Sequence, residues 1–294
     1  MRGQGFENAA ALLPGDIRAA ALALNAASRG RAEEFRLRAG APATVLLPEG
    51  EREFTGRAVN ARDLDSALEN ATRASAHTAL ENVASGFITV RGGVRVGLCG
   101  VVSESAGRVL TIRRLTSMSM RIPRQATGCA DLLWGELTAG GFKDTLLLSP
   151  PGGGKTTLLR ELVRRLSDVY RVSLLDERGE VAGVFDAVPE FDVGRRTDVL
   201  TGVDKRRGTD MLLRAMNPQV LAMDEITSPE DVEAVKAAAG CGVVLLATAH
   251  APNPEEMLHR PVYRSLLGLG VFRRAVQIDC RLGVRSYTIK EIAP

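Results

Sequence analysis

The sequence is poor in cysteine, and its four cysteines are widely separated. Cys99, Cys129, Cys241 and Cys280 form no C-x-x-C pair among the 294 residues. This spacing argues against a structural zinc site and a disulfide framework, and it is typical of proteins in a reducing compartment. We therefore expect an ordinary hydrophobic core to hold the fold together, which a chain of this length can build.

Long hydrophobic runs are also missing. The longest apolar run, Val243–Ala247 with its neighbours, is far shorter than the about 20 residues that span a bilayer. The N-terminus carries Glu7 and no long apolar segment, so we expect no signal peptide. We therefore predict a cytoplasmic protein that remains free to dock at a membrane complex as a peripheral protein.

Two styles of hydrophobic pattern divide the chain near residues 123–128. Before this point the pattern predicts an N-terminal α+β domain, residues 1–125, with strands that alternate between apolar and polar residues. The expected elements are a helix around Ile17–Leu24, a strand, turn and strand over Glu34–Leu47, a helix over Ala61–Ser75, and short strands within Gly86–Gly100 and Arg108–Ile122.

Residues 126–294 predict a second, larger domain of α/β type. Its strand candidates show almost no alternation, as expected of a parallel sheet that is covered by helices on both faces. They are Thr145–Leu148, Val172–Leu175, Val220–Met223 and Val243–Ala247. A helix is expected after the third strand, with Ser228 as N-cap, Pro229 at the first position, Asp231 in the first turn and Gly240 at the end.

A glycine-rich run between a predicted strand and a predicted helix has the residues that bind phosphate. Its sequence over 149–156 is Ser-Pro-Pro-Gly-Gly-Gly-Lys-Thr. Glycines let backbone N–H groups curl around a phosphate, and the helix start adds its dipole. Lys155 brings charge to the β- and γ-phosphates, and the Thr156 hydroxyl can ligate Mg²⁺. Ser149 replaces the usual glycine, but serine is small and we expect the loop to form. The predicted ATP-binding residues are Pro151, Gly152, Gly153, Gly154, Lys155, Thr156 and Thr157.

A second signal is an apolar strand, Val220–Met223, that ends in the carboxylates Asp224 and Glu225. Asp224 is placed to hold Mg²⁺ through water, and Glu225 is placed to polarise the attacking water. Acids also occur at solvated strand ends, but their combination with the glycine-rich loop predicts an ATP-hydrolysing P-loop protein. The cofactors are then ATP and Mg²⁺, and the sheet is RecA-like.

Two more strand ends carry polar residues. Asp176 and Glu177 follow the second strand, where they either orient water or pair with nearby arginines. We rank Glu177 second to Glu225 as the activating carboxylate. The strand after the helix runs into Thr248 and His250, and either side chain can sense the γ-phosphate; a histidine at a strand end can equally be structural.

Arginines are concentrated between residues 91 and 124. This stretch contains seven arginines, a single acid, Glu104, and no aromatic residue. A nucleic-acid surface, a solvated face and a subunit interface that supplies an arginine finger are the competing interpretations. Missing aromatics argue against nucleic acid, because bases stack on such rings. The turn at Gly194–Asp198 offers Arg195 and Arg196 as further finger candidates.

Several motifs together resemble the stage III sporulation protein AA family. In the second domain they are Ser149–Arg160, Asp176–Gly183, Arg196–Leu200, Met216–Glu225 and Ala247–His250; elsewhere they are Glu34–Arg38, Gly86–Gly100, Ser119–Ile122 and Phe272–Val276. The resemblance covers nearly the whole chain. Its loop is generic, whereas the stretches 86–100 and 176–183 are specific.

This resemblance implies more than the spacing does. The family is similar to the hexameric ATPases of type II and type IV secretion systems, with a RecA-like core and an N-terminal domain that packs in a ring. It implies a homo-hexamer that powers a sporulation channel between mother cell and forespore, with membrane-channel proteins as partners. By the same likeness, Arg95 and Arg121 become arginine-finger candidates.

Two other functions remain as alternatives. One is a RecA-like ATPase that acts on single-stranded nucleic acid, with the arginine band as its footprint and a steep salt dependence as its signature. The other is a scaffold that binds ATP without hydrolysing it. Glu225 favours the motor, since a scaffold has no need of a water-activating carboxylate.

Overall fold

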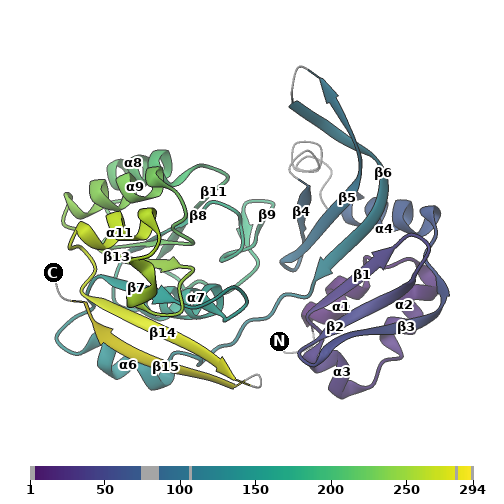
Figure 1. The fold of residues 1–294 in the computed structure, drawn as a ribbon, viewed down its shortest axis with the longest axis horizontal. Helices are drawn as coiled ribbons and strands as arrows, with labels where there is room; N and C mark the ends of the chain where they lie inside the picture. The colour runs from purple at the N-terminus through teal and green to yellow at the C-terminus, as the bar shows by residue number, and fades with distance from the viewer. Residues whose placement is uncertain (1–3, 74–85, 106–107, 282–283, 293–294) are drawn as a thin grey trace. The chain divides into compact units, whose positions relative to one another are not determined.

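The computed structural model describes residues 4–73, 86–105, 108–281 and 284–292 (Figure 1). The chain divides into two compact units. Unit 1 holds residues 1–125 together with Gly183–Phe191, and unit 2 holds Ala126–Ala182 and Asp192–Pro294. The chain thus leaves unit 2 once, for nine residues, and returns to it. No helix in the described ranges is both long and apolar enough to cross a bilayer.

Unit 1 is a six-stranded antiparallel sheet with helices. Its strand order is β3-β2-β1-β6-β5-β4, and each neighbouring pair runs antiparallel. The elements are α1 (Gln4–Ala10), α2 (Gly15–Leu22), α3 (Ala26–Arg31), β1 (Glu34–Arg38), β2 (Pro42–Leu47), β3 (Gly50–Ala58), α4 (Ala61–Arg73), β4 (Phe87–Val90), β5 (Val94–Ser105) and β6 (Arg108–Arg121).

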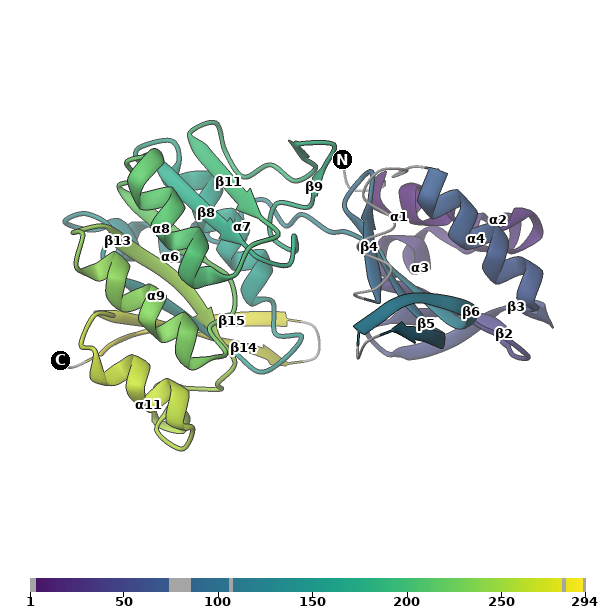
Figure 2. The ribbon, with the colours of Figure 1, turned by 90° about the horizontal axis from the view of Figure 1, so that it is seen from above.

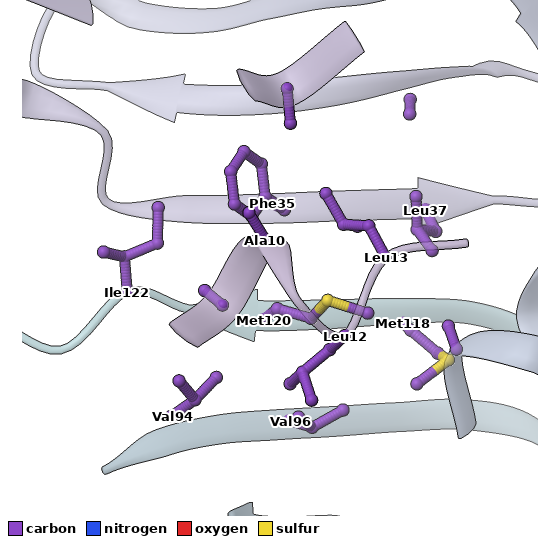
Figure 3. Packing of buried hydrophobic residues seen from close by; sticks show 14 of the residues in the cluster. Ala10, Leu12, Leu13, Phe35, Leu37, Val94, Val96, Met118, Met120 and Ile122 are labelled. Carbon is purple, nitrogen blue, oxygen red and sulfur yellow. The ribbon is translucent and has the colours of Figure 1, made fainter. Parts of the chain in front are cut away.

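Alternation along the strands explains the core of unit 1. On β1, Phe35 and Leu37 are fully buried, whereas Arg36 and Arg38 between and after them stay partly exposed. Phe35 is opposite Met120 on β6 and Leu37 is opposite Met118, and Figure 3 shows these side chains among aliphatic residues from neighbouring elements. A sheet with one apolar and one polar face needs helices over the apolar face only.

A short hairpin from the middle of the chain belongs to unit 1. Its strands are β9 (Val184–Phe185) and β10 (Val188–Pro189), which pair antiparallel. The Phe191 ring that follows lies against the turn between β4 and β5, where a Cβ on Gly93 would come within 2.7 Å of it. Gly93 has a φ of 72°, so both its backbone and its neighbour require glycine.

Unit 2 is built on a seven-stranded sheet of order β11-β8-β12-β13-β7-β14-β15, and all neighbouring pairs are parallel except β14 with β15. Its elements are α6 (Asp131–Thr138), β7 (Thr145–Leu148), α7 (Lys155–Leu166), β8 (Val172–Asp176), β11 (Thr197–Thr201), α8 (Lys205–Ala215), β12 (Val220–Met223), α9 (Pro229–Ala239), β13 (Val244–Ala249), α10 (Pro254–Met257), α11 (Pro261–Gly268), β14 (Arg274–Arg281) and β15 (Val284–Glu291).

Helices cover both faces of this sheet. Figures 1 and 2 show α8, α9 and α11 on one face and α6 with α7 on the other. Every residue of β7, β8 and β12 is buried, as continuous apolar strands in such a sandwich require. The mixed α/β fold expected from the sequence is confirmed.

The sequence predicted the ends of α9 correctly, because its capping residues are characteristic. α9 begins after Ser228, which with Asp231 forms a reciprocal capping box, and Gly240 is its C-cap, as expected. The sequence did not predict β3, the β9–β10 hairpin or the β14–β15 hairpin. β3 is exposed or half-buried along its whole length, so it carries little of the apolar signal on which such a prediction rests.

An ion-pair cluster with one buried member, Asp63, joins three elements of unit 1. Arg57 on β3 donates to Asp16 on α2, with N–O distances of 2.6 and 2.7 Å, and to Asp63 on α4, at 2.6 and 2.9 Å. Asp63 is buried and also accepts from the N–H of Asn60. The hydrogen bonds from Arg57 hold the pKa of Asp63 below its usual range.

We predict that Asp63→Asn lowers the free energy of unfolding by about 1–3 kcal/mol at pH 7, because Arg57 loses a charged partner. A carboxylate with a lowered pKa stabilises the fold above about pH 4 and loses this contribution as the pH falls through its folded value. The difference between wild type and variant should therefore shrink in acid. Urea unfolding at several pH values tests this, with the exposed Asp65→Asn on the same helix as control. Equal losses at pH 7 and pH 2.5 would contradict it.

Candidate functional site

The glycine-rich loop connects β7 to α7. Gly152 and Gly154 have φ values of 76° and 102°, a region that only glycine adopts freely. A Cβ on Gly153 would lie 2.2 Å from the Ser149 Oγ, so this position also requires glycine. Ser149 is absent from the residues with positive φ, and its hydroxyl donates to the Pro150 carbonyl at 2.8 Å. Serine therefore replaces glycine here without backbone strain.

Lys155 begins α7 and is almost completely buried, with 5% of its surface exposed. Its ammonium donates to the carbonyl oxygens of Ser149 at 2.9 Å and Pro150 at 3.3 Å, and to the Nδ1 of His250 at 2.8 Å. Burial lowers the pKa of Lys155 to about 8, although the charges of Asp224 and Glu225 oppose the shift. The loop thus folds around a partly compensated positive charge.

His250 links the lysine to Glu225. An ammonium only donates, so Nδ1 must accept; Nε2 then carries the proton and donates to the Glu225 carboxylate 2.7 Å away. Burial and the charge of Lys155 lower the pKa of His250, which keeps the ring neutral near pH 7. The second carboxylate oxygen of Glu225 accepts from Arg178 at 3.1 Å. Lys155, His250, Glu225 and Arg178 therefore form one continuous chain of polar contacts.

Thr248 fixes the two acids at the end of β12. Its hydroxyl donates to Asp224 at 3.0 Å and accepts from the backbone N–H of Glu225 at 2.9 Å. Glu225 has a φ of 41°, a strained conformation for a residue with a side chain. Burial raises the pKa of Asp224 to about 6, and the neighbouring carboxylates Asp176 and Glu225 add to the shift.

The acids that follow β8 have other partners. Asp176 is fully buried and accepts from the N–H groups of Glu180, Val181 and Ala182 at 2.8–3.1 Å, which fixes the turn after the strand. Glu177 accepts from the buried Lys205 on α8 at 2.7 Å. The sequence left two alternatives for these acids, orientation of water or pairing with arginines. The contacts favour pairing, but the cation that pairs with Glu177 is Lys205.

Each of the four arginine-finger candidates has contacts within its own unit. Arg95 stacks on Phe87 with 4.0 Å to the ring centre, and Arg121 lies 3.7 Å from Glu34. Arg195 lies 3.8 Å from Asp168, and Arg196 donates to the carbonyls of residues 168 and 169, just after α7 ends. The loop is at the other end of α7, about 18 Å away for 12 residues.

Sequence reasoning missed three arginines near the loop. Arg178 pairs with Glu225, and Arg285 on β15 donates to the carbonyl of Gly153 at 3.2 Å. The buried Arg160 on α7 donates to the carbonyls of Glu180 and Val181 at 2.8 and 2.5 Å. Arg178 could have been found, because its strand end shares a sheet edge with Glu225. Arg285 had no such signal.

The residues present fit a nucleotide with Mg²⁺. A Cβ on Gly153 or Gly154 would clash with Ser149 or Arg285, so the loop can form only with glycine at these positions. The buried Lys155 lies beside the loop. In the described part of the chain, no group of three or more acids, histidines or cysteines could hold a metal alone. Mg²⁺ is usually held by one or two carboxylates plus substrate phosphates, which matches Asp224 with the Thr156 hydroxyl.

Two solved structures with a similar fold are an ATPase and a pilus retraction motor. The Yersinia pseudotuberculosis ATPase DotB matches 95% of this chain and 80% of its own, with a TM-score of 0.60 and 13% identity. The pilus retraction motor PilT with bound ADP matches 90% of this chain and 80% of its own, with a TM-score of 0.60 and 15% identity. At such identities the likeness shows the fold alone, which is the fold of DotB and PilT.

Sequence comparison gives the family. The model of the family "Sporulation stage III, protein AA" matches residues 6–286. Stage III sporulation protein AA of Bacillus subtilis (strain 168) is 34% identical over 253 residues, 84% of this chain and 82% of the relative. Protein SEEDLING PLASTID DEVELOPMENT 1 of Arabidopsis thaliana is 30% identical over 177 residues, 57% of this chain and 25% of that protein. The chain belongs to the stage III sporulation protein AA family, as the motifs had indicated.

Thr248→Val should destabilise the protein by about 1–3 kcal/mol, because it leaves the half-buried Asp224 carboxylate and the Glu225 N–H without their hydrogen-bond partner. Thr248→Ser keeps the hydroxyl and should recover most of the loss. Urea unfolding of both variants measures the difference. A valine variant as stable as wild type beside a destabilised serine variant would show that the methyl group, and not the hydroxyl, is what the site needs.

Proposed function

We propose that the protein is a Mg²⁺-dependent ATPase with a RecA-like core that hydrolyses ATP to ADP and phosphate. The observation that carries this proposal is the contact chain from Lys155 through His250 to Glu225. It joins a phosphate-binding lysine to a carboxylate that can activate water. Family membership and the fold of DotB and PilT support the same activity.

Each residue has a distinct role in this proposal. Loop N–H groups from Gly152 to Thr157 hold the phosphates, and Lys155 gives up its loop carbonyls to bind them. Thr156 and Asp224 hold Mg²⁺, which neutralises charge that develops on the phosphates. Glu225 accepts a proton from the attacking water. His250 loses its contact with Lys155 when the lysine binds phosphate, so it reports the occupied state to Glu225.

Glu177 and the finger arginines complete the proposal. Glu177 remains the second candidate for water activation, and its pairing with Lys205 places it behind Glu225. Arg95, Arg121, Arg195 and Arg196 are proposed to act on a neighbouring subunit's site. Arg195 and Arg196 could act only on a neighbour's site, because they lie at the far end of α7 from their own loop.

We propose further that the protein works as a homo-hexamer, in the cytoplasm or at the membrane surface, and powers a sporulation secretion channel. The support is its family, together with a fold that it shares with the pilus retraction motor PilT. Membrane-channel proteins are then its partners. Single-stranded oligonucleotides that bind with a steep salt dependence and stimulate hydrolysis would favour the alternative, a nucleic-acid ATPase.

Glu225→Gln should lower kcat by about 10²–10³-fold and leave ATP affinity nearly unchanged, because the amide cannot accept the proton. Lys155→Ala should abolish both binding and turnover. Steady-state hydrolysis and equilibrium ATP binding separate the two effects. Glu230→Gln, exposed on α9, is the matched control and should behave as wild type. Full turnover by Glu225→Gln would rule out its proposed role.

Mixing two inactive variants tests whether an arginine acts between subunits. Lys155→Ala has intact arginines, and Arg121→Ala has an intact loop, so mixed rings should contain roughly a quarter of complete sites at equal amounts. We expect ATPase activity to return on mixing, and activity of wild type to rise with protein concentration. Arg114→Ala, an exposed arginine of the same band, should be active alone. No recovery for Arg121, nor for Arg95, Arg195 and Arg196 in the same assay, would exclude fingers at these positions.

A further inference from the structure

Arg285 reaches the phosphate loop from the far end of the chain. β14 runs parallel to β7, with Gln277 opposite Leu148, the last residue of that strand. The four remaining residues of β14 therefore extend past β7 at the edge where the loop begins. β15 returns beside them with Arg285 opposite Cys280, which brings Arg285 level with the loop (the yellow hairpin in Figure 1).

The Arg285 side chain packs directly on the loop glycines. Its Nε donates to the Gly153 carbonyl at 3.2 Å, and a Cβ on Gly154 would lie 2.5 Å from that Nε. The residue is nevertheless exposed, and its two terminal nitrogens have no hydrogen-bond partner in the described part of the chain. A guanidinium anchored through one nitrogen thus presents its remaining donors and its flat face beside the loop.

The topology places Arg285 at one particular end of a bound nucleotide. β7 lies between β13 and β14 in the sheet. The Lys155 ammonium contacts His250, which follows β13, so the β- and γ-phosphates lie on that side. The ribose and base must then leave the loop on the opposite side, toward β14 and β15.

Tyr287 lies on the same face of β15 as Arg285, because alternate residues of a strand share a face. Its side chain is half-buried; burial and Cys129 raise its pKa, and Arg285 opposes the shift. Cys129 in turn contacts the carbonyl of Thr157, in the first turn of α7, at 3.9 Å. Arg285 and Tyr287 therefore flank the loop together on its nucleoside side.

We propose that Arg285 is a nucleotide-binding residue that packs its guanidinium on the base and ribose, with Tyr287 as the adjoining wall. This inference rests on the proposed nucleotide site. A guanidinium is planar, weakly hydrated and able to stack on aromatic rings, which an ammonium is not. The β14–β15 hairpin thus serves as the nucleoside half of the site, and the loop serves as its phosphate half.

The test compares binding of ADP and of inorganic tripolyphosphate to the full-length protein by calorimetry. Arg285→Ala should weaken ADP binding by roughly tenfold and leave tripolyphosphate binding unchanged, because that ligand has no nucleoside. Arg285→Lys should not restore ADP affinity. Lys290→Ala, on the opposite face of the same strand, should bind both ligands as wild type does. Unchanged tripolyphosphate binding also shows that the variant loop is folded.

Two outcomes overturn the proposal. Equal weakening of both ligands would make Arg285 a brace for the loop, acting through the Gly153 carbonyl. Unchanged ADP affinity in Arg285→Ala would remove it from the site. Both differ from a failure of the proposed function, in which the wild-type protein itself binds no ADP.

Discussion

A buried positive charge organises unit 2. The Lys155 ammonium lies in a water-poor setting at the sheet edge, where an uncompensated charge is very costly. Two loop carbonyls, the neutral ring of His250 and the acids of β12 share its compensation. These groups come from three neighbouring strand ends, so the loop keeps its shape only if β7, β13 and β12 keep their order and parallel direction. In the proposed function, the lysine would exchange these contacts for a phosphate.

The turn after β8 extends this organisation along the chain. Asp176 holds the backbone N–H groups of residues 180–182, and Arg160 on α7 holds the carbonyls of residues 180 and 181. Burial lowers the pKa of Arg160 to about 10, so it remains charged and paired at neutral pH. The next residues, Gly183–Phe191, pack within unit 1. The helix that begins at the phosphate loop is therefore connected, through one fixed turn, to a segment of the other unit.

The sequence revealed those parts of the site whose chemistry is local. The loop, the carboxylates after β12 and His250 each follow a strand within a few residues, and a parallel sheet brings such ends together. The cap of α9 was equally readable. Arg285 was not, because it lies 132 residues from its loop partner and only the register of β14 on β7 joins them. The partner of Glu177 could not be predicted either, because Lys205 comes from α8 and no local pattern indicates that pair.

The arginines around α7 and the phosphate loop fall into two groups according to their position. Arg160 contacts the turn after β8, Arg178 contacts the Glu225 carboxylate, and Arg285 contacts the loop. All three contacts lie within one chain, so these arginines shape the site of their own chain. Arg195 and Arg196 lie beyond the opposite end of α7, and no rotamer of an arginine spans about 18 Å of helix. The local set already supplies a cation, Arg178, to Glu225. An arginine from a neighbour would then add charge only at the γ-phosphate, where it develops during hydrolysis. Under the proposed function, subunit contact would govern turnover, whereas nucleotide binding would be a property of the single chain.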